Sequence, residues 1–285
     1  MHSVTSITEL RQRLHRWRAQ QQSIALVPTL GNLHQGHLAL VERAQQRADR
    51  VVVSVFVNPL QFGHNDDLAR YPRTPQQDEQ QLRQAGVDLL FMPTTEEIYP
   101  AGAQAVTVVE VPELSDILCG AQRPGHFRGV ATVVTKLFNM VQPDIALFGE
   151  KDWQQLTIIR RLVADLNLSV EIIAVPIVRD SDGLALSSRN SYLSTRERQL
   201  APELYRTLRL IAHRLSLGED NLLALEEEGL NRLRQAGFQP DYVAIRAAES
   251  LALPQSVDRK LVILAAVRLG QTRLIDNLLW NAISV

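Results

Sequence analysis

The sequence has very little cysteine: Cys119 is the only one among 285 residues. One thiol cannot form an intrachain disulfide or a zinc site built from several thiolates, and this scarcity is typical of a reducing cytoplasm. Long apolar runs are missing too, since none approaches the roughly 20 residues of a membrane span, and the N-terminal residues lack a signal-peptide core. We therefore expect a cytoplasmic protein without a membrane partner.

An excess of charge of one sign is also missing. Lysine and arginine total 30 against 31 aspartate and glutamate residues, a formal net charge of −1. This balance gives no electrostatic reason to expect a nucleic-acid partner. Hydrophobic residues make up 45% of the chain and charged residues 21%, which is ordinary for a globular protein with a real core.

Short apolar runs alternate with helical periodicities through the first two thirds of the chain. This alternation predicts an α/β fold, a doubly wound parallel (Rossmann-like) sheet with helices on both faces. The predicted strands are 24–27, 51–57, 87–92, 145–148 and 170–175, and the predicted helices include 8–17, 74–86, 130–138 and 153–163, with a loop at 120–129.

The pattern changes after the turn-rich stretch near residue 180. Helices are predicted at 200–215 and 222–236, and strands at 242–245, 261–267 and 274–275. We therefore expect two domains. Residues 1–178 would form the Rossmann-like domain, and residues 179–285 a smaller C-terminal α+β domain.

The most unusual stretch is Pro28-Thr29-Leu30-Gly31-Asn32-Leu33-His34-Gln35-Gly36-His37. It joins an apolar strand to a helix that should begin near Gly36, and a helix N-terminus presents N–H groups and a partial positive charge that suit phosphate. His34 and His37 are three apart, so both imidazoles can face one ligand. Such a pair is more often a solvated surface pair or a metal clip, but its position after a strand and a glycine turn favours phosphate.

Three further polar clusters, 58–61, 149–155 and 178–189, also follow predicted strands. Ligands of open parallel sheets bind beyond the carboxyl ends of the strands, so we expect the clusters to converge on one pocket. Each has a plainer explanation when taken alone. Lys151 could be a surface lysine, Gln61 could satisfy turn backbone, and Ser187-Ser188-Arg189-Asn190 could be a helix cap and loop.

Together these segments resemble one family. Residues 28–37 resemble the P-T-M-G-x-L-H-x-G-H signature of the pantothenate synthetases, which are HIGH-motif nucleotidyltransferases. Residues 58–62 resemble N-P-M-Q-F, residues 148–156 resemble F-G-E-K-D-x-Q-Q-L, and residues 186–190 resemble the counterpart of a K-M-S-K-S loop; residues 70–74 and 123–129 also match. Leu30 in place of methionine, and Gln35 where an acidic residue is common, are departures that remove no reacting group.

The resemblance implies an ATP-dependent ligase that joins pantoate to β-alanine through a pantoyl adenylate, giving pantothenate, AMP and diphosphate. It also implies Mg²⁺ and a homodimer. The implied catalytic residues are His34, His37, Lys151 and Arg189, with Gln61, Gln155 and Arg123 on the acid substrate. The implied ATP site comprises Leu30, Gly31, Asn32, Leu33, His34, Gln35, Gly36, His37, Gly149, Glu150, Lys151, Asp152, Val178, Leu186, Ser187, Ser188 and Arg189.

Asp78 lies where the family has a magnesium-associated acid, but an acidic residue early in a helix is equally explained by the helix dipole. Two rival functions stay open. A nucleotidyltransferase that makes dinucleotide cofactors shares H-x-G-H without the two glutamine motifs. A non-catalytic nucleotide- or RNA-binding module is disfavoured by the near-neutral charge and the complete set of phosphate ligands.

Overall fold

The computed structural model describes residues 1–63, 66–103 and 105–281. The chain forms two compact units, one of Met1–Glu150 with Ile158–Pro176 and one of Lys151–Thr157 with Ile177–Val285. Compactness alone does not define domains that fold independently, so the predicted division at residue 178 stays a prediction. The second unit also includes residues 151–157, which the predicted division assigns to the first domain.

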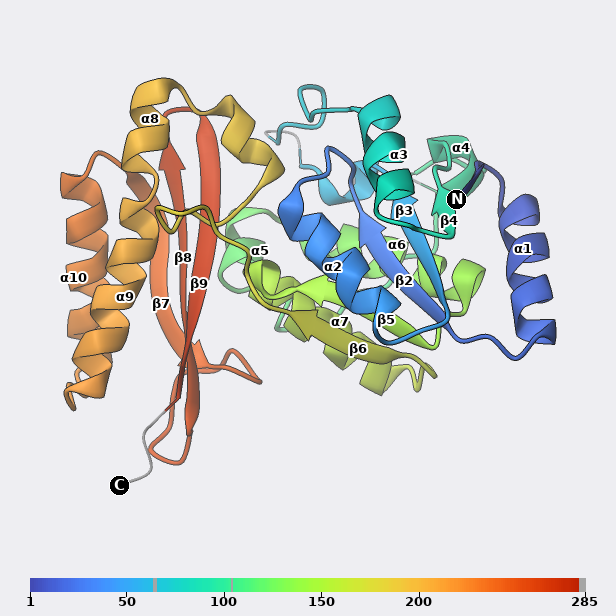
Figure 1. Ribbon diagram of the computed structural model, residues 1–285. Coiled ribbons are helices and arrows are strands. Elements are labelled where there is room, and N and C mark those ends of the chain that lie inside the picture. Colours follow the sequence, from blue (N-terminus) through green and yellow to red (C-terminus); the bar gives the residue numbers. More distant parts are fainter. Residues whose placement is uncertain (64–65, 104, 282–285) are drawn as a thin grey trace. The chain divides into compact units, whose positions relative to one another are not determined.

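A six-stranded parallel sheet forms the first unit, in the order β1-β4-β3-β2-β5-β6 (Figure 1). β2 lies near the middle of the sheet, and the strands that follow it are added first on one side and then on the other, so the order reverses between β2 and β5. The doubly wound prediction is confirmed. The strands are β1 (His2–Val4), β2 (Ile24–Thr29), β3 (Arg50–Val55), β4 (Leu89–Phe91), β5 (Ile145–Gly149) and β6 (Glu171–Val175).

Helices pack on both faces because alternate residues of the buried strands point to opposite sides. On one face, Val27 and Val53 join a cluster with Leu40 and Val41 of α2 (Gln35–Gln45) and Leu82 of α3 (Pro75–Gln84). The other face is covered by α1 (Ile7–Ala19) and α6 (His126–Val141), which contact each other. α7 (Trp153–Asp165) joins β5 to β6.

Two parts of the first unit differ from the sequence prediction. The edge strand β1 is only three residues long, too short to show a periodic pattern. The predicted loop at 120–129 instead contains α5 (Cys119–Gln122) and the first turn of α6. Its glycines and proline are typical of a loop, but the chain uses them at the helix ends and at a close helix contact. Short turns at α4 (Thr95–Ile98) and η1 (Pro59–Gln61) complete the unit.

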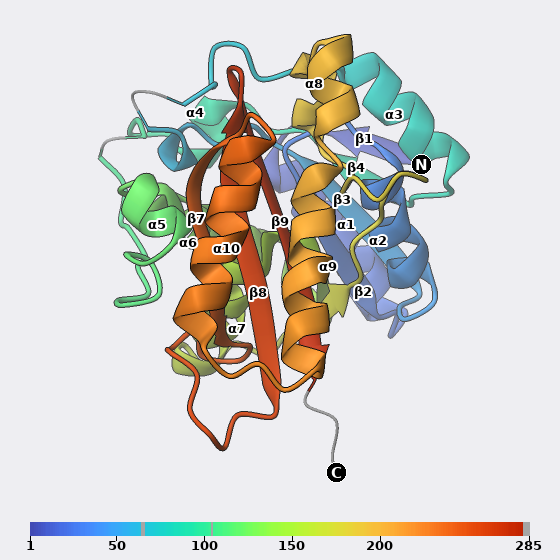
Figure 2. The same cartoon turned by 90° about the vertical axis from the view of Figure 1, so that its left-hand side faces the viewer.

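The second unit is an antiparallel sheet with two helices on one face (Figure 2). α9 (Glu203–Ser216) and α10 (Leu222–Gln235) lie across β7 (Gln239–Ala247), β8 (Lys260–Leu269) and β9 (Thr272–Asn281). The core between them includes Leu208, Ile211, Leu233 and Ile263. η3 (Ser188–Tyr192) and α8 (Thr195–Leu200) precede α9.

β9 is far longer than the predicted 274–275. Two buried polar residues, Asp276 and Asn277, interrupt its apolar pattern and hide the strand from a periodicity argument. Among the described residues, no helix is both long enough and apolar enough to cross a membrane.

Candidate active site

The conformation of the turn after β2 is fixed by hydrogen bonds to a buried carboxylate, that of Asp78. Gly31 (φ +83°) and Asn32 (φ +50°) both adopt left-handed backbone conformations, which turn the N–H groups of Asn32 and Leu33 toward Asp78. These two N–H groups donate to Asp78 Oδ2 and Oδ1, each at 2.9 Å. Successive N–H groups converging on an anion form a nest. A Cβ on Gly31 would lie 3.0 Å from Asp78 Oδ2, so the approach requires glycine there.

Asp78 does not fit the predicted role of a metal ligand. Its side chain is 1% exposed, and Oδ1 also accepts from the Thr74 hydroxyl at 3.1 Å. These three partners are N–H or O–H donors, and they occupy lone pairs that a metal ligand would use. Within the described part of the chain, no group of three or more His, Cys, Asp or Glu side chains could hold a metal ion. We therefore derive no step through a metal at Asp78.

The two histidines cap α2 reciprocally. His34 is the N-cap, and its Nδ1 accepts from the Gly36 N–H at 3.1 Å, while His37 Nδ1 accepts from the His34 N–H at 3.3 Å. Their ring centroids are 4.1 Å apart. Because each Nδ1 is an acceptor, each neutral ring carries its proton on Nε2. The cap therefore fixes two neighbouring Nε2–H donors in one tautomer.

The other residues of the 28–37 stretch differ in burial and in which of their groups face the cavity. Leu33 is 7% exposed and packs in the core, so it offers the site only its backbone. The Gly36 N–H is used by the cap. Leu30 and Gly31 line a cavity of about 290 Å³ at the carboxyl ends of β2, β3 and β4, together with residues 55–57 and 92–95.

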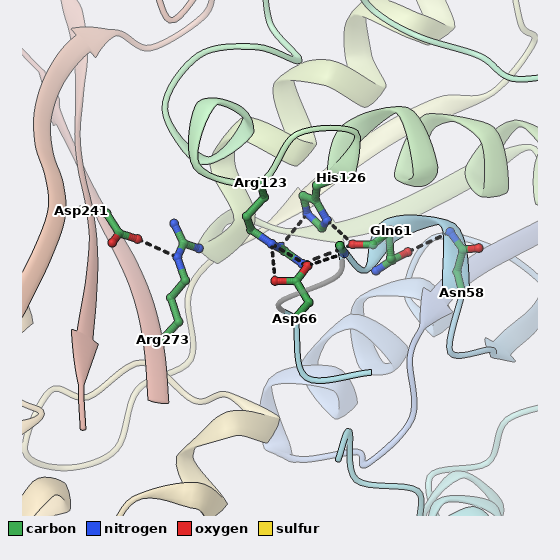
Figure 3. Close-up of polar contacts among 8 residues, drawn as sticks. Asn58, Gln61, Asp66, Arg123, His126, Asp241 and Arg273 are labelled. Atoms are coloured by element: carbon green, nitrogen blue, oxygen red, sulfur yellow. Dashed lines mark hydrogen bonds and ion pairs between the residues drawn. The ribbon is translucent and has the colours of Figure 1, made fainter. Parts of the chain in front are cut away.

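Gln61 lies in η1, and its amide and its backbone are held separately (Figure 3). The side chain is 8% exposed, and its Oε1 accepts from Asn58 Nδ2 at 3.2 Å. The backbone carbonyl accepts from His126 Nδ1 at 2.7 Å and from Arg123 Nη2 at 3.2 Å. The sequence motif predicts Gln61 but none of these supports.

Arg123 contacts the backbone of Gln61 and forms an ion pair with Asp66. Its guanidinium bonds Asp66 at 2.8 Å and His126 Nε2 at 3.0 Å (Figure 3). Burial acts to raise the pKa of Asp66, but the hydrogen bonds from Arg123 and the Gly63 N–H outweigh it and the pKa is lowered. In this geometry Arg123 is paired with Asp66 and donates to the Gln61 carbonyl, and the carboxylate contact expected from the sequence stays a prediction.

In the second unit, β9 holds the backbone of Lys151. Asn277 Nδ2 donates to the Lys151 carbonyl at 2.9 Å. The adjacent Asp276, 3% exposed, accepts two bonds from Arg179, at 2.6 and 2.9 Å. Burial raises the pKa of Asp276, and the positive charges of Arg179 and Lys151 oppose that shift. Sequence reasoning missed both β9 residues, although two polar residues inside an apolar strand are a signal for buried partners.

Arg179 also organises the serine-rich segment. Its guanidinium lies 3.7 Å from the centre of the Tyr205 ring and donates to the Gly183 carbonyl. A short hairpin follows, with the Leu186 N–H donating to the Val178 carbonyl at 2.9 Å. Ser187 then caps η3 by accepting from the Arg189 N–H at 3.3 Å, and Ser188 is 9% exposed. Lys151 and residues 187–189 belong to one unit. In that unit β9 contacts both the Lys151 carbonyl and η3.

Most of the remaining predicted residues lie at or just after the end of β5. Gly149 ends that strand, and Glu150, Lys151 and Asp152 form the turn η2 (Glu150–Asp152). Burial raises the pKa of Glu150. Gln35 begins α2. Gln155 is half-buried in the first turns of α7, in the second unit, whereas Gln61 belongs to the first.

Comparison with known proteins decides the family. The model of a family described as pantoate-beta-alanine ligase matches residues 2–279. The chain belongs to the pantoate–β-alanine ligase family. Its activity is the ATP-dependent condensation of pantoate with β-alanine to pantothenate.

Relatives cover nearly the whole chain. It is 58% identical to a pantothenate synthetase of Pseudomonas putida, over 98% of this chain and 97% of the relative, and 57% identical to one of Azotobacter vinelandii, over 98% of each. The crystal structure of pantothenate synthetase from Thermus thermophilus superposes with a TM-score of 0.91 at 48% identity, covering 98% and 99% of the chains. A ligase from Francisella tularensis, complexed with beta-gamma ATP and beta-alanine, gives 0.80 at 36% identity, covering 98% and 97%.

Proposed function

We propose that this ligase works through a pantoyl adenylate. A carboxylate oxygen of pantoate attacks the α-phosphorus of ATP, and the bond to diphosphate breaks. The amine of β-alanine then attacks the acyl carbon, loses a proton, and AMP leaves with the former carboxylate oxygen. A free carboxylate is a poor acyl donor because oxide is a poor leaving group, and adenylation removes that obstacle.

The observation that carries this proposal is the reciprocal cap of His34 and His37. We assign their Nε2–H groups to phosphate oxygens of ATP, where they donate without a proton change. Lys151 and Arg189 supply positive charge, and Ser187 and Ser188 supply hydroxyl donors, for the charge that builds as diphosphate leaves. The other ATP contacts that the family resemblance implies belong to the same proposal.

The deciding experiment is ATP–diphosphate exchange without β-alanine. We expect exchange that depends on pantoate, and passage of oxygen label from the pantoate carboxylate into AMP. Label retained entirely in pantothenate would overturn the adenylate. A covalent acyl-enzyme is the alternative, and the buried Cys119 is its thiol candidate; full exchange in Cys119→Ser would remove that candidate.

We assign the acid substrate to Gln61 and Gln155, with Arg123 as a third predicted contact. An amide can both donate and accept, so it can hold a hydroxy acid without neutralising its carboxylate. Alanine at Gln155 should weaken pantoate binding by roughly 10-fold or more while ATP affinity stays within a few-fold. A defect mainly in ATP affinity would reassign Gln155 to the nucleotide.

Mg²⁺ would arrive with the triphosphate of ATP, because Mg²⁺ keeps several waters and commonly uses one or two carboxylates with substrate phosphates. A homodimer and a cytoplasmic location, expected from the family and from the single cysteine, complete the proposal. Light scattering of the purified protein tests the dimer.

A further inference from the structure

The side chain of Asn58 is completely buried, and its amide makes four hydrogen bonds: the oxygen accepts two and the NH₂ group donates two. Its Oδ1 accepts from the Tyr99 hydroxyl at 2.7 Å and from the Leu60 N–H at 3.3 Å. Its Nδ2 donates to the Gly129 carbonyl at 3.0 Å and to Gln61 Oε1 at 3.2 Å. A flipped amide would set its NH₂ against the Leu60 N–H and its oxygen against the Gly129 carbonyl, and neither backbone group can reverse its role, so one orientation is strongly favoured.

The orientation of the Asn58 amide in turn determines the orientation of the Gln61 amide (Figure 3). Because Asn58 donates to Gln61 Oε1, the opposite end of the Gln61 amide, the NH₂ group, is the end that can face a ligand. An NH₂ group donates only, so it suits an acceptor oxygen such as that of an ionised carboxylate.

The frame around the two amides is tightly packed. A Cβ on Gly129 would lie 2.3 Å from the Leu60 carbonyl oxygen and 2.6 Å from the Gln61 nitrogen, so α6 lies directly against η1. This packing holds the Leu60 N–H and the Gly129 carbonyl, the two backbone groups that orient Asn58, close together.

Tyr99 begins the chain of hydrogen bonds. It follows α4, is 2% exposed, and its ring is near Phe56 and the Lys136 ammonium. Burial raises the pKa of Tyr99 above its ordinary value, so the phenol keeps the proton that it donates.

We propose that Tyr99 is a positioning residue that, through Asn58, makes Gln61 present its NH₂ group and thereby selects an anionic acid. This rests on the proposed contact between Gln61 and pantoate. Tyr99 itself touches no reacting atom, and its hydroxyl supplies the shorter of the two hydrogen bonds that hold Asn58 Oδ1 in this orientation.

The test compares Tyr99→Phe with Ile98→Val in the full-length enzyme. Ile98 is the buried neighbour in α4, and its variant loses one methylene group and no hydrogen bond. We expect Tyr99→Phe to raise the KM for pantoate about 10-fold, with the kcat and the KM for ATP within about 2-fold. Ile98→Val should change none of these.

A second measurement tests which end of the Gln61 amide faces the substrate. Pantoamide, in which NH₂ replaces a carboxylate oxygen, offers a donor where pantoate offers an acceptor. The preference for pantoate over pantoamide, measured by competition, should fall in Tyr99→Phe and not in Ile98→Val.

Gln61→Ala separates the two ways to fail. If it raises the KM for pantoate but Tyr99→Phe leaves that KM and the pantoamide preference unchanged, the positioning role is overturned and the Gln61 contact stands. If Gln61→Ala leaves pantoate binding normal, the contact and the positioning role are both overturned.

Discussion

Each of the two units contains a buried carboxylate, and the two carboxylates are stabilised in opposite ways. Asp78, 1% exposed, is surrounded by backbone N–H groups and a hydroxyl, all within the first unit. Asp276, 3% exposed, faces the guanidinium of Arg179 in the second unit. The carboxylate held by dipoles shapes a turn, whereas the carboxylate held by a cation is one half of an ion pair whose other, partly buried charge depends on it.

The largest expected effect therefore comes from breaking the ion pair. Asp276→Ala leaves the Arg179 guanidinium, whose side chain is 16% exposed, without its carboxylate, and we expect a loss of about 3 kcal/mol in the free energy of unfolding. Urea titration measures it. The double variant Arg179→Met with Asp276→Leu should recover much of that loss, and a double variant no more stable than Asp276→Ala would contradict the explanation.

Asp78→Asn tests the other carboxylate with a smaller expected effect. Asparagine keeps one acceptor but sets an NH₂ group against an N–H donor, so we expect a loss of about 1–3 kcal/mol in unfolding free energy and a raised KM for ATP. The Mg²⁺ concentration that gives half-maximal rate should stay that of the unaltered enzyme. A clear rise in that concentration would show that Asp78 binds the metal after all.

The smallest effect is expected at the tether between β9 and Lys151. Asn277→Ala removes one donor from the Lys151 carbonyl, a loss of about 0.5–1.5 kcal/mol, which is roughly 2- to 12-fold in rate if it falls entirely on the transition state. The defect should appear in ATP–diphosphate exchange. An unchanged exchange rate would remove the tether from the mechanism.

Much of the fold follows from sequence because the central strands are continuous apolar runs. Residues 51–57, for example, can only be stabilised when both faces are covered. β1 was not predicted because three residues are too few to show a periodic pattern. β9 was predicted too short because Asp276 and Asn277, two polar residues, interrupt its apolar pattern, and their buried partners cannot be read from the sequence.

The sequence predicts which residues form the candidate site, but not which other residues hold them in place. The family resemblance implies His34, His37, Gln61 and Lys151, and the structure places each of them at a strand-to-helix connection. Nothing in the spacing puts Asp78 against a turn 45 and 46 residues earlier. Contacts of this kind depend on how strands pair and how side chains point, which a single sequence does not contain.

Lys151 and the other groups assigned to the phosphates should act on adenylation and not on amide formation. The most direct measurement supplies synthetic pantoyl adenylate and β-alanine to Lys151→Ala and compares the rate with that from ATP, pantoate and β-alanine. We predict that the complete reaction slows by about 100-fold or more, while the reaction from the adenylate keeps a rate within several-fold of the unaltered enzyme. An equal loss in both reactions would contradict the account.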